Sequence, residues 1–172
     1  MRYEQISSLE EFLSQVESKL LDPEQRVSVS FPSTSTTPWN SDALIRANLS
    51  TLESVAGSAN VYAIFTGAGG GSESPLRYFG KTTRRLARER IKNHLFRKSE
   101  NTGSKLAQVL KHTCGGGTIK IAWIEVHPES LRNYLEEELI KRHPEADWNR
   151  ENRGGINTPV DTLSCYSDDM AE

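Results

Sequence analysis

The chain has 172 residues, of which 35% are hydrophobic and 26% are charged, as is ordinary for one globular domain with a modest core. No apolar run approaches the roughly 20 residues of a membrane-spanning helix, and the N-terminus lacks the basic and then apolar pattern of a signal peptide. We therefore expect a cytoplasmic protein without membrane contact. Two widely separated cysteines, Cys114 and Cys165, argue against a disulfide framework and a zinc knuckle.

Residues 1–56 predict a helix, a short strand and a second helix. Apolar residues recur at helical spacing over 6–21, and a short alternating strand follows at 26–31. After a loop rich in Ser, Thr and Pro at 32–40, a helix is predicted over 41–53. The segment contains no recognisable catalytic motif, so we interpret it as an extension that completes the core.

Residues 57–153 predict strand, strand, helix, helix, strand and helix. The strands are predicted at 61–66, 76–81 and 118–126, and the helices at 82–98, 102–112 and 128–143. This order is typical of a small α+β domain with an antiparallel sheet. The polar tail at 154–172 is expected to be mobile.

Charge is unevenly distributed along the chain. Over residues 81–111, ten cations against two anions leave a net charge of +8, so the remainder must carry −10 for the total of −2. A solvated helix face is the commoner reason for a charge run, but the many arginines, whose planar forks match phosphate oxygens, favour a polyanion-binding surface. The candidate nucleic-acid-binding residues are Arg84, Arg85, Arg88, Arg97, Lys98 and Lys105.

A set of potentially reactive side chains occurs in a fixed order along residues 60–152. It comprises two tyrosines on the predicted hairpin strands, an arginine and a histidine on the next helix, a carboxylate and a late amide. These residues are Tyr62, Tyr78, Arg90, His94, Glu136 and Asn149. Metal-assisted phosphodiester cleavage requires side chains of these kinds, and their order resembles that of the GIY-YIG nuclease family.

The resemblance includes three departures from the family pattern. The tyrosine triplets read Asn-Val-Tyr at 60–62 and Tyr-Phe-Gly at 78–80, so asparagine replaces the first glycine and apolar residues replace both isoleucines. No reactive side chain is lost. The resemblance implies a three-stranded antiparallel sheet flanked by helices, DNA as the partner and Mg²⁺ as the cofactor, with Mn²⁺ able to substitute.

The resemblance also assigns roles to the tyrosines. It implies that Tyr62 accepts the proton of the attacking water and that Tyr78 assists, with Gly80 supporting the site. A phenol with a pKa near 10 is a poor base at neutrality. We therefore expect a nearby cation or metal-bound water to lower the tyrosine pKa, and Lys81 is well placed to help. Each tyrosine alone is also a common half-buried strand residue.

The catalytic arginine has two candidates. At 100° per residue, Arg90 and His94 share one border of the apolar helix face, and Arg88 lies on the other border. The family's pairing of arginine with a histidine four residues later favours Arg90, whereas the distance from Tyr78 slightly favours Arg88. We expect Arg90 to hold the scissile phosphate and His94 to orient a phosphate or protonate a leaving group.

Three consecutive glutamates offer candidate metal ligands. With Leu135 on the buried face, Glu136 is expected to be partly buried and Glu137 to point into solvent. A partly buried carboxylate needs a partner, and Mg²⁺ takes few protein carboxylates, so Glu136 is the predicted ligand. Asn149 is expected to tie the last helix to the active-site strand, with a simple turn or cap as an equal alternative.

These features predict a Mg²⁺-dependent endonuclease that hydrolyses DNA. The alternative from another class is a nucleic-acid-binding domain that keeps the fold without cleavage. Within nucleases, restriction, repair, mobile-element and toxin-like enzymes all remain open.

Overall fold

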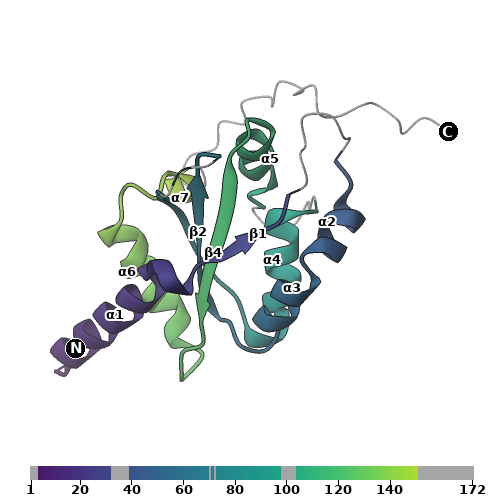
Figure 1. Ribbon diagram of the computed structural model, residues 1–172. Coiled ribbons are helices and arrows are strands. Elements are labelled where there is room, and N and C mark those ends of the chain that lie inside the picture. The colour runs from purple at the N-terminus through teal and green to yellow at the C-terminus, as the bar shows by residue number, and fades with distance from the viewer. Residues whose placement is uncertain (1–3, 32–38, 70, 72, 98–103, 151–172) are drawn as a thin grey trace.

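A four-stranded antiparallel sheet forms the centre of the molecule (Figure 1). The computed structural model describes residues 4–31, 39–69, 71, 73–97 and 104–150. The sheet order is β1-β4-β2-β3, with the strands β1 Val27–Val29, β2 Val61–Gly67, β3 Leu76–Lys81 and β4 Thr118–Ile124. The predicted α+β class is confirmed.

The expected three-stranded sheet is wrong, because β1 joins it as a fourth strand. β1 pairs with β4 through three residues, from Val27 opposite Ile121 to Val29 opposite Ile119. The sequence predicts this strand but not its partner. A strand of three residues has too little pattern to specify its pairing, which depends on contacts far along the chain.

Seven α-helices surround the sheet in the described part of the chain. They are α1 Ile6–Leu21, α2 Ser41–Ala47, α3 Leu49–Val55, α4 Ala87–Leu95, α5 Leu106–Cys114, α6 Leu131–Arg142 and α7 Asp147–Arg150. Short 3₁₀ turns occupy Pro23–Gln25 and Arg84–Leu86, so the helix predicted from residue 82 begins later. None of these helices has the length and apolar character needed to cross a bilayer.

The helix predicted over 41–53 is two helices, and Asn48 separates them. Its side chain is buried, accepts a hydrogen bond from the Ser30 amide at 2.8 Å and donates one to the Ser30 carbonyl at 2.9 Å. Asparagine competes with helical hydrogen bonds in this way. The break therefore fastens α2 and α3 to the end of β1.

Each face of the sheet has its own core. One core joins α2, α3, α4 and α5 to the face that carries Tyr62 and Tyr78. The other joins α1 and α6 to the face that carries Val61 and Phe79. Figure 1 shows α1 and α6 on one side of the sheet and α2 to α5 on the other. Strand alternation thus divides the apolar side chains of β2 and β3 between the two cores.

Most of the predicted loop at 32–40 and the whole predicted tail at 154–172 lie outside the described residues. The N-terminal elements contribute to both cores, α1 on one face and β1, α2 and α3 on the other. They are therefore part of the same packed unit as the sheet.

Candidate active site

The two tyrosines lie on one face of adjacent strands. The β2–β3 register places Tyr62 opposite Gly80 and Tyr78 opposite Ile64, so both rings emerge toward α4 and α5. The ring centroids are 6.1 Å apart. Gly80 makes this approach possible, because a Cβ there would overlap the Tyr62 ring and hydroxyl. The strand alternation that places hydrophobic residues in the core therefore also brings the two phenols together.

Helix α4 adds Arg90 and His94 to the tyrosines. The His94 ring centroid lies 5.8 Å from that of Tyr62 and 5.4 Å from that of Tyr78. The Arg90 guanidinium lies within electrostatic reach of both tyrosine hydroxyls. Arg88 is exposed. Of the two arginine candidates, the structure brings Arg90 to the tyrosines.

Burial dominates the ionisation of the tyrosines. It raises the pKa of Tyr62 well above its ordinary value of 10.0, with the Tyr78 charge adding to the shift and Arg90 opposing it. The pKa of Tyr78 is also raised, again by burial first, with Arg90 opposing and Glu136 adding. The expected lowering of the tyrosine pKa is therefore not found. Both side chains are hydroxyls at neutral pH.

His94 is buried, with 1% of its surface exposed. Burial, followed by the nearby charges of Arg90 and Lys105, lowers its pKa to about 3. Its Nδ1 accepts a hydrogen bond from the Lys105 main-chain amide at 3.2 Å. The sequence offered phosphate orientation and proton donation for this residue, and its neutral state favours the first.

Lys105 belongs to the site and not to the surface. The sequence places it in the basic stripe, but only 1% of it is exposed, and its Nζ lies 5.3 Å from the Tyr78 ring centroid. It occupies the N-cap of α5, where the helix dipole disfavours a cation. A lysine directly before a helix is the sequence feature that could have indicated an unusual environment. The predicted helix began at residue 102, so Lys105 was assigned to the interior of the helix.

Glu136 and Lys81 form an ion pair on the other face of the edge strand β3. The Lys81 Nζ lies 2.7 Å from the Glu136 carboxylate, whose side chain is 15% exposed. The carboxylate reaches Tyr78 electrostatically, since its charge raises the tyrosine pKa. Glu137 is exposed. Because β3 is at the edge of the sheet, no strand of the described residues lies between the Glu136 side of the sheet and the tyrosine side.

The described residues offer a divalent cation a carboxylate ligand near Tyr78. Among the described residues, no three His, Cys, Asp or Glu side chains cluster as a metal cage. Glu136 is a part-buried carboxylate within electrostatic reach of Tyr78. Mg²⁺ commonly takes one or two carboxylates and fills its shell with water and phosphate oxygens. The donor set fits that type of site, in which Lys81 competes for the same carboxylate.

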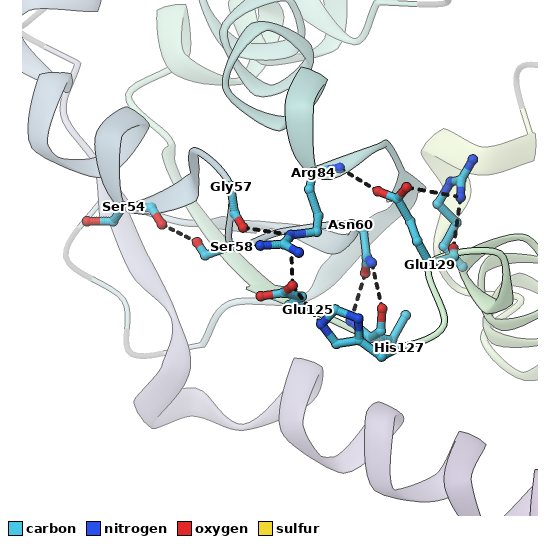
Figure 2. A network of polar contacts seen from close by, with 10 residues as sticks. Ser54, Gly57, Ser58, Asn60, Arg84, Glu125, His127 and Glu129 are labelled. Carbon is cyan, nitrogen blue, oxygen red and sulfur yellow. Dashed lines mark hydrogen bonds and ion pairs between the residues drawn. The ribbon is translucent and has the colours of Figure 1, made fainter.

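Arg84, predicted to bind phosphate, is held by protein groups (Figure 2). Its Nε donates to the Gly57 carbonyl at 3.0 Å and lies 2.8 Å from the Glu125 carboxylate, which also contacts His127 Nε2 at 2.7 Å. Its main-chain amide donates to Glu129 at 2.7 Å. Arg84 thus joins the end of α3 to the connection between β4 and α6.

The remaining predicted nucleic-acid-binding residues differ in their placement. Arg85, Arg88 and Arg97 are exposed. Lys98 lies outside the described residues. The surface available for phosphate in the described structure is therefore smaller than the sequence predicts.

Two asparagines fasten the active-site strands. Asn149 accepts a hydrogen bond from the Phe79 amide and donates one to the Phe79 carbonyl, each at 2.8 Å, so it ties α7 to the free edge of β3. Asn60, which stands in place of the family's glycine, donates to the Val126 carbonyl at 2.8 Å and accepts from its amide at 3.0 Å. The second clamp was not predicted. Its signal was a polar residue directly before a buried strand.

A cavity of about 600 Å³ lies farther along the same strands. Its lining includes Thr66 and Arg77 from the hairpin, Lys111 and His112 from α5, and Trp148 from α7, but neither tyrosine. The Arg77 guanidinium donates hydrogen bonds to the Thr66 hydroxyl at 2.9 Å and to the Asp147 carboxylate at 3.2 Å. The lining of this cavity therefore does not include the reactive cluster.

No family model, no curated protein and no solved structure matches this chain. The arrangement of these side chains is thus the basis for any functional assignment.

Proposed function

We propose that the chain is a metal-dependent DNA endonuclease that hydrolyses phosphodiester bonds through a GIY-YIG type of site. The observation that supports this proposal most is the convergence of Tyr62, Tyr78, Arg90 and His94. Three separate elements, β2, β3 and α4, bring these side chains into one polar cluster inside a hydrophobic core. Groups whose pKa values are shifted by burial and by nearby charges, as those of Tyr62, Tyr78 and His94 are, cluster at functional sites.

Arg90 has the clearest role in this proposal. It is the most exposed of the four side chains, and it lies beside both tyrosine hydroxyls. A guanidinium in that position can hold the scissile phosphate and stabilise the negative charge that grows on it during hydrolysis. The phosphate would then lie next to the phenols.

Tyr62 is the candidate acceptor of the proton from the attacking water, with Tyr78 assisting. Because the pKa of Tyr62 is raised by burial, the free protein holds it as a hydroxyl at neutral pH. Deprotonation then requires additional positive charge near the site. Mg²⁺ held by Glu136 would supply that charge and polarise the phosphate.

A second candidate function is nucleic-acid binding without cleavage. Its support is the burial of the Tyr62 hydroxyl together with the Lys81–Glu136 ion pair, which occupies the one candidate metal ligand. A protein of this kind would keep the exposed arginines and the fold but would not activate water.

Cleavage of linear, branched and single-stranded DNA, with and without Mg²⁺ or Mn²⁺, separates the two functions. We expect wild-type protein to cut only with metal, and Glu136→Gln to fold normally and fail to cut. This variant should bind DNA as tightly as wild type or slightly tighter, because a carboxylate without its cation repels phosphate.

Glu137→Gln is the matched control, because Glu137 is exposed on the same helix. It should cut at close to the wild-type rate. Absence of cleavage by wild-type protein under all these conditions, or full activity of Glu136→Gln, would replace the nuclease proposal by the binding-domain alternative.

A further inference from the structure

One hydrogen bond determines which ring nitrogen of His94 carries a proton. The Lys105 main-chain amide donates to His94 Nδ1 at 3.2 Å. A main-chain N–H can only donate, so Nδ1 must be unprotonated. A neutral imidazole has one N–H, and here that N–H is at Nε2. The main-chain amide of Lys105, the N-cap residue of α5, thus selects the tautomer of a histidine on α4.

The surroundings of His94 keep the ring neutral. The titratable and charged groups that face it are Tyr62 on β2, Tyr78 on β3, Arg90 on its own helix and Lys105 at the start of α5. Two are hydroxyls at neutral pH and two are cations, so none of them stabilises an imidazolium. The pKa of His94, lowered to about 3, agrees with this geometry.

The resulting N–H has no partner in the described protein. His94 Nε2 is buried and makes no hydrogen bond with the described residues. A buried polar atom without a partner typically costs about 1–3 kcal/mol. Proteins tolerate that cost mainly where a ligand or an ordered water supplies the missing oxygen.

We propose that His94 recognises a phosphate oxygen as a neutral hydrogen-bond donor, through an Nε2–H that the Lys105 amide fixes in place. The identity of the oxygen rests on the proposed function, whereas the tautomer does not. His94 then does not protonate the leaving group. Giving up its only N–H would leave an imidazolate, a state that two nearby cations do not make accessible at neutral pH.

The tautomer can be observed directly in the full-length protein. Imidazole ¹⁵N NMR distinguishes protonated from unprotonated ring nitrogens, and the signals of His94 are those missing from His94→Gln. We expect a protonated Nε2 and an unprotonated Nδ1 between pH 5 and 8. A protonated Nδ1, or a ring that titrates within this range, would overturn the proposal.

A matched pair of variants tests the donor. In His94→Gln, the side-chain amide nitrogen can take the place of the Nε2–H donor. In His94→Asn, the side-chain carbonyl can still accept from the Lys105 amide, but the shorter side chain brings no donor to the position of Nε2. With a short DNA duplex in the presence of EDTA, the Gln variant should bind within about twofold of wild type. The Asn variant should lose roughly tenfold, the size expected for one hydrogen bond to a charged oxygen. Equal affinities for both variants contradict the donor role.

Inorganic phosphate provides a probe that does not depend on cleavage. Titration with phosphate should shift the His94 Hε2 resonance in wild type and leave the exposed His127 unchanged. If the resonance shifts but no DNA is cut, the donor proposal stands and the nuclease proposal fails. If DNA is cut, but the His94 resonance does not shift and the Gln and Asn variants bind DNA equally, the nuclease proposal stands and the donor proposal fails.

Discussion

Gly80 shows how one residue without a side chain positions two aromatic rings. A Cβ at Gly80 would overlap the Tyr62 ring and would lie 2.6 Å from Tyr78 Cε1. Both rings are almost fully buried and have little room to move. We predict that Gly80→Ala lowers the free energy of unfolding by about 1–3 kcal/mol, the usual cost of overpacking a core. Urea denaturation measures this change.

The matched control is Gly115→Ala. Gly115 is exposed, and the nearest atom to a Cβ there is a carbonyl oxygen at 3.4 Å, so its effect should stay within about 0.5 kcal/mol. A wild-type urea midpoint for Gly80→Ala would show that the rings do not depend on this glycine.

Arg90 and Arg88 differ by two residues and face different surroundings. Arg90 lies beside the tyrosine hydroxyls, and Arg88 is exposed. If the nuclease proposal holds, Arg90→Ala should lower the cleavage rate on the order of a hundredfold or more, as the loss of a transition-state donor does. Arg88→Ala should cost far less and mainly weaken binding. Single-turnover rates at saturating protein separate the two effects, and a reversed order would place the phosphate on the other side of α4.

At the scale of residues, the sequence predicts the direction in which a side chain points better than it predicts the burial and pKa of that side chain. Helical spacing was enough to place Arg90 and His94 on one border of α4 and to expose Glu137 but not Glu136. It did not predict that burial raises the pKa of Tyr62 or removes Lys105 from the surface. Those properties depend on how α5 packs over the hairpin, and no local pattern encodes that packing.

At the scale of elements, segments with a clear apolar pattern were predicted well, and those that depend on distant contacts were predicted poorly. The bounds of α1 and β3 agree with their apolar patterns. The division between α2 and α3 and the pairing of β1 both depend on contacts with distant segments. Asn48 takes part in both, because its amide bonds to Ser30 at the end of β1. A tertiary hydrogen bond here overrides a helical pattern.

Asn149 connects two elements at the other edge of the sheet, as Asn48 does near β1. Its amide makes both hydrogen bonds with the Phe79 backbone at the free edge of β3. We predict that Asn149→Ala lowers the free energy of unfolding by about 1–3 kcal/mol, since it leaves buried backbone groups without partners. Hydrogen exchange at the Phe79 amide should accelerate at the same time.

Asn133→Ala supplies the comparison, because Asn133 is exposed on α6. It should leave both the stability and the exchange rate of Phe79 near their wild-type values. Unchanged exchange at Phe79 in Asn149→Ala would mean that α7 does not depend on this clamp.

At the scale of the molecule, the charge segregation of the sequence serves two purposes. Part of the basic segment builds the fold: Arg84 joins the α3 end to the β4–α6 connection, and Lys105 enters the site. Another part, including Arg85 and Arg97, is exposed and lies outside these contacts. A count of charges along the chain cannot separate these groups, because acidic partners such as Glu125 come from distant segments.

This division predicts how DNA affinity responds to salt. For an exposed surface of this kind, the log of affinity falls against the log of salt concentration with a slope of about −0.9 for each phosphate neutralised. Arg97→Gln should therefore make the slope shallower by about 0.9, whereas Arg84→Gln should leave the slope nearly unchanged and lower stability instead. Arg46→Gln, an exposed change on α2, controls for net charge. Fluorescence anisotropy with a short duplex at several salt concentrations measures the slopes. If Arg84→Gln and Arg97→Gln flatten the slope equally, Arg84 leaves its contacts with Glu125 and Gly57 to bind phosphate, and the basic surface is as large as the sequence alone predicts.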